Sequence, residues 1–176
     1  HGDLFTTGFG TDRRSEVSYR HGGDIGADAH WRADVRLTSS PGRTEAPVGG
    51  GPDAWSDGRV AFRYDRELAS GDIMIGVAAC RGTGDDVVTT VLPAPPFSTK
   101  RTTTSANVEA SAIARWTRRG PRNEVALQLY HDHVERSMSG LWHRMATTDF
   151  DVRVATAAGR HSLVWGGGMR IIGDAS

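Results

Sequence analysis

The sequence of 176 residues lacks several features that mark common classes of protein. A single cysteine, Cys80, excludes a disulfide framework and a cysteine-rich zinc site. Acidic and basic residues are equal in number, at 21 each, so no net charge favours binding to nucleic acid or to an anionic membrane surface. The longest apolar runs reach about eight residues, far short of the roughly 20 in a transmembrane helix, which excludes a helical membrane protein.

Motifs of catalysis are also absent. No serine stands in a Gly-x-Ser-x-Gly frame, and there is no glycine-rich phosphate loop. Asp85 and Asp86 have too few oxygen ligands near them in sequence for a calcium loop. The arginines around Gly120-Pro121 lie at a turn signal in a neutral chain, which is not typical of a nucleic-acid patch. We therefore expect no enzyme activity, no cofactor and no nucleic-acid partner.

One short motif could hold a metal ion. His131 and His133 are two residues apart, so on a strand they would point the same way, about 6.5–7 Å apart, as in some zinc and iron sites. Glu135 or His143 could supply a third ligand. The alternative is that this segment is the polar tip of a strand, and that interpretation is favoured, so we predict no metal.

Alternation of apolar and polar residues runs through most of the chain. In residues 107–118, Val108, Ala110, Ala112, Ala114 and Trp116 alternate with mostly polar residues, and Ile113 is the exception. The clearly alternating segments are 30–38, 57–66, 107–118, 124–136 and 141–155. The weaker ones are 2–10, 16–22, 72–80 and 161–172. The pattern predicts an all-β fold, an antiparallel up-and-down meander of about nine strands with no helix.

Strand length and connection length favour a segment of a transmembrane β-barrel. Several alternating segments run to about 10–15 residues, longer than usual strands, and their polar sides carry charges of both signs. Alternate connections are short, at 23–29, 67–71, 119–123 and 156–160. Of the others, 39–56 and 81–106 are long, and the connections after the first and seventh segments are short. Tight turns at one end and long loops at the other are typical of bacterial outer-membrane barrels.

Three stretches resemble the β-barrel of TonB-dependent outer-membrane receptors. Residues 2–10 through 19–23 resemble the first hairpin after the plug of that family. Residues 113–118 and 127–130 resemble a mid-barrel hairpin. Residues 150–153 and 161–170 resemble the family's phrase His-x-Leu-x-Trp-Gly-x-Gly-Tyr-Arg, with Met169 in place of the tyrosine. The three stretches occur in the family's order and span nearly the whole chain.

The resemblance implies an active-transport receptor of the bacterial outer membrane, which imports a scarce nutrient such as a ferric siderophore, cobalamin or a glycan. The chain begins at His1 and ends soon after Ile172, so we expect residues 1–176 to be one partial barrel domain, the early part of the wall. Signal peptide, TonB box, plug and later strands are not among these residues. The implied partners are outer-membrane lipid, the plug and remaining strands, and the TonB complex through the plug.

Alternation also assigns side chains to the two sides of the expected wall. The residues expected to face the lumen and contact ligand are Arg59, Arg63, Arg115, Asp149, Asp151 and Arg153. The aromatic residues expected to form girdles at the membrane interfaces are Tyr19, Trp31, Tyr64, Trp142 and Trp165. The expected outer loops are 39–56, 81–106 and 137–143.

Two other classes of function are compatible with parts of the pattern. A soluble β-sandwich could bind carbohydrate through exposed tryptophans, although long strands and sorted connections do not favour it. A metal-dependent enzyme of the double-stranded β-helix type could be built on His131 and His133, but it would need further His and Glu ligands at wider spacing than Glu135 provides.

Overall fold

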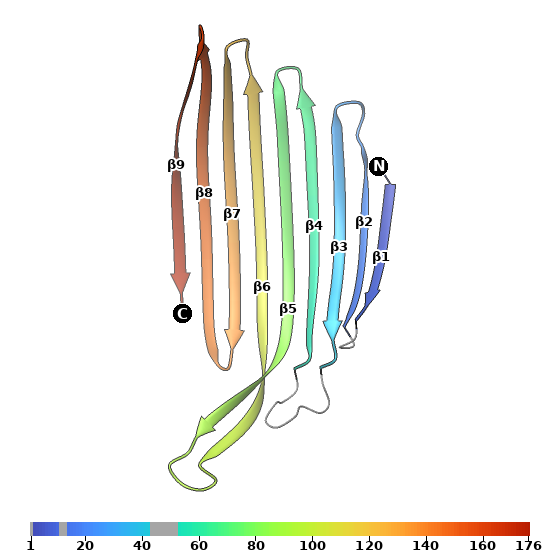
Figure 1. Ribbon diagram of the computed structural model, residues 1–176, viewed down its shortest axis with the longest axis vertical. Helices are drawn as coiled ribbons and strands as arrows, with labels where there is room; N and C mark the ends of the chain where they lie inside the picture. The colour runs from blue at the N-terminus through green and yellow to red at the C-terminus, as the bar shows by residue number, and fades with distance from the viewer. Residues whose placement is uncertain (1, 11–13, 43–52) are drawn as a thin grey trace.

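The computed structural model describes residues 2–10, 14–42 and 53–176 and consists of one antiparallel sheet. Nine strands follow one another in chain order across the sheet, as an up-and-down meander (Figure 1). The strands are β1 (Gly2–Phe9), β2 (Ser15–Asp24), β3 (Ala29–Ser40), β4 (Trp55–Leu68), β5 (Gly71–Val91), β6 (Ser98–Arg119), β7 (Asn123–Met138), β8 (Leu141–Ala158) and β9 (His161–Ala175). The described residues contain no helix. The expected all-β meander is confirmed.

Successive connections between strands alternate between the two ends of the sheet. At the end that we call the turn end, β2–β3, β4–β5, β6–β7 and β8–β9 are joined by residues 25–28, 69–70, 120–122 and 159–160. At the opposite end, the loop end, lie the connections after β1, β3, β5 and β7. The four short connections expected at alternate positions therefore lie at the turn end, and the short connections after β1 and β7 lie at the loop end.

The segment expected as a long loop between β5 and β6 is mostly strand, which corrects the sequence analysis. Pairing continues without a break to Val91 opposite Ser98, so only residues 92–97 connect the two strands. The paired arms are rich in Val and Thr, the β-branched residues that fit a pleated sheet. Residues 85–91 and 98–105 thus form a two-stranded extension beyond the neighbouring strands at the loop end (Figure 1).

The other two expected outer loops differ from each other. Residues 137–143 are not a loop: a tight turn at Ser139-Gly140 joins β7 to β8, and both turn residues have positive φ, at 54° and 85°. That conformation matches the twist of paired strands in a two-residue hairpin. The expected loop 39–56 is strand at both ends, and its residues 43–52 lie outside the described residues.

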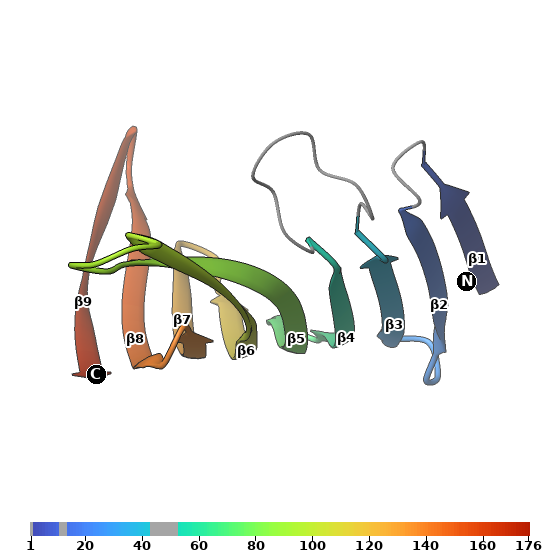
Figure 2. The same cartoon turned by 90° about the horizontal axis from the view of Figure 1, so that it is seen from below.

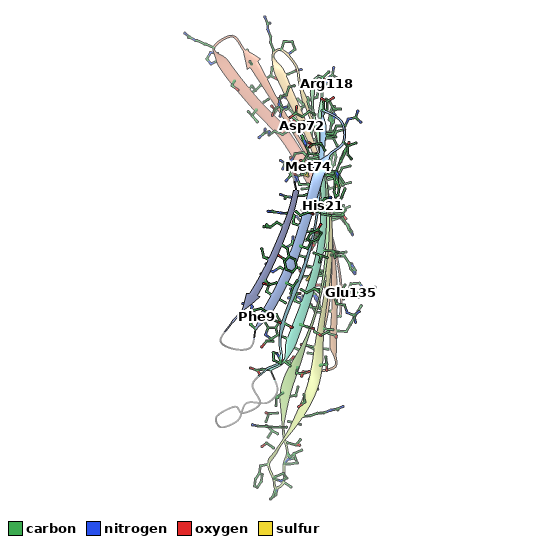
Figure 3. All side chains as sticks on the ribbon, turned by 90° about the vertical axis from the view of Figure 1, so that its right-hand side faces the viewer. Phe9, His21, Asp72, Met74, Arg118 and Glu135 are labelled. Carbon is green, nitrogen blue, oxygen red and sulfur yellow. The ribbon has the colours of Figure 1, made fainter. Side chains whose placement is uncertain are left out.

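The sheet is curved into a shallow trough, with β1 and β9 at its two rims (Figure 2). Residues paired across strands share a face, and the pairing Tyr19–Val35–Val60–Ala79 belongs to the convex face. The alternate residues belong to the concave face. Figure 3 shows the two faces from the side: Arg118 and Glu135 extend from the convex face, and Asp72 and Met74 lie on the opposite face.

A hydrophobic core is almost absent from the described residues. Only Ala29, Thr38 and Thr117 are buried, and no large side chain among the described residues is fully enclosed. Many large apolar side chains are instead exposed on the convex face, such as Leu129 and Phe150. A folded soluble domain buries most such residues, so this sheet needs an apolar environment or another layer to cover its convex face.

Each turn at the turn end lies further along the strand direction than the one before it, like the steps of a staircase. The size of this offset gives the inclination of the strands. Asp24–His30, the last pair before the first of these turns, lies in register with Asp151 of β8. The last pair before the fourth turn, Ala158–His161, lies seven residues beyond Asp151. This offset of seven residues accumulates over six strand spacings. The strands are therefore inclined by about 40° from the perpendicular to the line that joins the four turns. Figure 1 shows the same progressive rise.

Two neighbouring glycines of β9 should respond differently to substitution by alanine. A Cβ added to Gly166 would lie 2.1 Å from the carbonyl oxygen of Val152, whereas one added to Gly167 has no atom within 4 Å. We expect Gly166→Ala to lower the free energy of unfolding by about 1–3 kcal/mol through overpacking. Gly167→Ala should change it by less than about 0.5 kcal/mol. Urea unfolding in detergent, followed by far-UV circular dichroism, measures both, and equal losses would contradict this close approach.

Candidate functional site

The concave face carries most of the charged side chains of the sheet. Cross-strand ion pairs span it: Arg36 lies 2.8 Å from Glu16, and Arg153 lies 3.1 Å from Glu124. At the β8–β9 rim, Arg170 donates two hydrogen bonds to Asp149, of 2.7 and 3.0 Å. These pairs are largely exposed, so each contributes little to stability, and together they indicate a hydrated surface rather than a packed one.

All of the residues expected to face a lumen lie on this concave face. Arg59 and Arg63 lie on β4, Arg115 on β6, and Asp149, Asp151 and Arg153 on β8. Arg63 donates to Asp65, two residues along the same strand, and Arg115 donates to the side-chain oxygen of Gln128 at 3.0 and 2.5 Å. The sheet does not gather them in one place, since they extend from β4 to β8. Their contact with a ligand stays a prediction.

A cavity of about 530 Å³ opens on the loop-end half of the concave face. Arg14, Arg36, Trp55 and Arg59 line its β2–β4 side. Asp57, Cys80, Glu109, Ser111, Tyr130 and Asp132 line the rest. This volume lies within the range of small-molecule sites, and its lining is polar and charged.

The convex face carries an apolar band bounded by charges. Near the turn end its charged residues are Asp3, Arg66 and Arg118. Nearer the loop end they are Arg81, Glu135 and Arg144, followed by Asp85 and Lys100 on the β5–β6 extension. Between the two sets, the described strands place no Asp, Glu, Lys or Arg on this face. In β8 the band covers residues 146–154, close to the about 9–11 tilted residues of a strand that crosses a membrane.

Aromatic rings on the convex face follow the staircase of turns. Trp31, Tyr64 and Trp165 lie within four residues of the turn-end termini of their own strands, and Tyr19 lies five residues before the end of β2. Trp31 contacts neighbouring rings, with centroids 6.3 Å from Phe62 and 5.1 Å from His21. Because these residues step along the sheet with the turns, they form one inclined row.

The remaining member of the expected girdles lies at the loop end. Trp142 immediately follows the turn between β7 and β8, and the guanidinium of Arg144 lies 5.0 Å from its ring centroid. Arg144 also pairs with Glu135 on the same convex face, at 2.5 Å. An aromatic ring beside an ion pair is the mixture of polar and apolar contacts typical of a membrane interface.

The possible metal ligands are divided between the two faces. His131 and His133 share the convex face, where His131 lies 2.9 Å from the Thr148 hydroxyl and His133 lies 3.3 Å from Glu135. His143 lies on the concave face and pairs with Asp174 at 2.9 Å, so it cannot join them. Among the described residues, no group of three His, Cys, Asp or Glu side chains could hold a metal ion.

Sequence reasoning missed three contributors to these surfaces. Trp116 belongs to the turn-end row of rings but was assigned only to an apolar side. Trp55 and Arg14 line the cavity, with the Arg14 guanidinium 5.7 Å from the Trp55 ring centroid. Strand alternation could have placed Trp116 in the row, whereas Arg14 precedes β2 and carries no periodic signal.

No family model, curated protein or solved structure matches this chain. The described residues contain no helix that is long and apolar enough to cross a membrane.

Proposed function

We propose that this chain forms part of the wall of an outer-membrane β-barrel, of the TonB-dependent receptor type, which imports a scarce nutrient. The observation that carries the proposal is the polarity of the curved sheet. Most charged residues lie on its concave face, and a largely apolar band without Asp, Glu, Lys or Arg lies on its convex face. A small soluble barrel encloses its apolar side chains, whereas a transmembrane barrel turns them outward to lipid.

The inclination of the strands supports the same environment. Strands of outer-membrane barrels are tilted by about 35–45°. The staircase of turns gives a value of about 40° if all turns lie in one plane parallel to the membrane. The turn-end row of Trp31, Tyr64, Trp116 and Trp165 then lies in that same plane, as an interfacial girdle would.

The two rims of the sheet constrain how such a wall could close. β1 and β9 run in the same direction, because every neighbouring pair from one rim to the other is antiparallel (Figure 1). Antiparallel closure around this wall therefore takes an odd number of further strands. A second copy in the same membrane orientation would place its β1 parallel to β9, so it does not satisfy this requirement.

The receptor part of the proposal rests on the resemblance, with support from the concave face. The β5–β6 extension at the loop end would reach outward, and the cavity would open toward the lumen on the same half of the wall. An outer segment that captures a ligand and a polar inner wall that guides it are what import requires. The nutrient itself is not named by any motif.

The experiment that tests the proposal compares the full chain in buffer, in detergent and in phospholipid vesicles. We expect aggregation in buffer, and a β-rich far-UV spectrum with stable partitioning into detergent or vesicles, because the apolar band has no partner in water. A soluble monomer that unfolds cooperatively in buffer would overturn the proposal. It would instead favour a soluble carbohydrate-binding module that presents its tryptophans on the convex face.

A further inference from the structure

We propose that one corner of the concave cavity, formed by Arg14, Arg36, Trp55 and Arg59, binds the anionic group of a small organic ligand. The inference deepens the proposed function and rests on it, since it assigns a chemical class to the ligand of the same concave face. It is carried by the register of β3 and β4, by the count of charges in the corner and by the shape of the cavity.

Two arginines face each other across neighbouring strands. Arg36 of β3 is directly opposite Arg59 of β4, on the same face, which brings their Cβ atoms to about 4.5–5.5 Å. Like charges directly opposite destabilise a sheet, because each raises the electrostatic energy of the other. An anion between the two guanidiniums would remove this repulsion and gain two charged hydrogen-bond donors at once.

The corner holds more positive than negative charge. Glu16 accepts a hydrogen bond from Arg36 at 2.8 Å and lies 4.0 Å from Arg14, so two guanidiniums share one carboxylate. Within the described residues, no carboxylate oxygen lies within 4.0 Å of the Arg59 guanidinium. Asp57 lies between Trp55 and Arg59 on the same face of β4, so three cations and two carboxylates meet at this end of the cavity.

The carboxylates of the cavity leave one positive charge of the corner unbalanced. Asp57 accepts a hydrogen bond from the Cys80 thiol at 3.3 Å. Glu109 is engaged by Asn107 at 3.1 Å and by Arg136 at 3.4 Å, on the side away from β4. Asp132 lies on β7, three strand spacings or about 14 Å from Arg59.

The chemistry of the corner defines the class of ligand. Guanidinium groups bind carboxylate, phosphate or similar oxygen pairs through two parallel hydrogen bonds. Trp55 is 38% exposed and offers a flat apolar surface beside these donors. The cavity of about 530 Å³ can hold a small molecule but not a folded domain. An organic anion with a planar portion fits all three properties.

The probe for this site is benzene-1,2,4-tricarboxylate, a flat trianion, titrated calorimetrically into the full chain in neutral detergent micelles. We expect binding that weakens as sodium chloride is added, and none for the uncharged analogue benzamide. Arg36→Gln and Arg59→Gln should each weaken binding about tenfold or more, and Arg59→Lys should weaken it less. The matched control is Arg170→Gln, which removes an arginine from the same face outside the cavity and should leave binding unchanged.

A second readout does not depend on the probe. Without ligand, Arg59→Gln should raise the urea midpoint of unfolding, because it removes the repulsion with Arg36. Absence of tricarboxylate binding by the β-folded chain, equal weakening in Arg170→Gln, or a lower midpoint for Arg59→Gln would each overturn the inference. The proposed function fails separately: a chain that binds the probe but stays soluble without detergent refutes the membrane wall and retains the anion site.

Discussion

In phospholipid vesicles, brominated lipids should quench the fluorescence of single-tryptophan variants that retain only Trp116 or only Trp165. They should not quench a variant that retains only Trp55. Trp116 and Trp165 lie on the convex face, three and four residues from the turn-end termini of β6 and β9. Trp55 lies on the concave face, at the cavity. Because bromine quenches only at short range, lipid on the convex side alone gives this contrast.

The depth of the bromine atoms adds a second test within the same variants. Lipids brominated near the headgroup should quench Trp116 and Trp165 more strongly than lipids brominated near the chain end, since the turn-end row belongs to the interface. The other tryptophans are replaced by phenylalanine in each variant to preserve the ring. Equal quenching of all three tryptophans would contradict a wall with one face to lipid and one to water.

The strand order could be predicted from the sequence because each strand is half polar. Alternation is a local signal, and segments such as 30–38 and 107–118 lie wholly within β3 and β6. The β5–β6 extension was missed for the same reason: beyond the neighbouring strands both sides of it meet water, so alternation fades while Thr and Val keep the backbone extended. To predict where a strand ends, the pairing register is therefore required as well as the alternation of the sequence.

The two faces of the candidate wall followed from alternation, but the anion corner did not. Arg36 and Arg59 lie 23 positions apart, and their opposition depends on how β3 and β4 align. A shift of one residue between the two strands would move every side chain of one of them to the other face. The connection 41–54 is too long to fix this alignment as a two-residue turn does, so the sequence alone leaves the juxtaposition open.

Placing an arginine in the middle of the apolar band should have the largest effect on stability. Leu129 lies on the convex face, between Ala114 and Phe150, and its neighbour Gln128 lies on the concave face. In lipid vesicles we expect Leu129→Arg to lower the free energy of unfolding by about 2–4 kcal/mol, the cost of a cation near the middle of the bilayer. Gln128→Arg, the matched control, adds the same side chain to the hydrated face and should change it by less than about 1 kcal/mol.

Which of the two variants loses more stability distinguishes a convex face against lipid from a convex face in water more sharply than partitioning does. If the convex face met water, Leu129, which is 50% exposed, could become arginine at almost no cost, and Gln128→Arg would be the more disruptive change because it adds a charge beside Arg115. Urea unfolding followed by tryptophan emission measures both variants in vesicles. A cost confined to Leu129→Arg requires hydrocarbon against the convex face, because in water the exposed Leu129 would tolerate arginine better than the half-buried Gln128 beside Arg115.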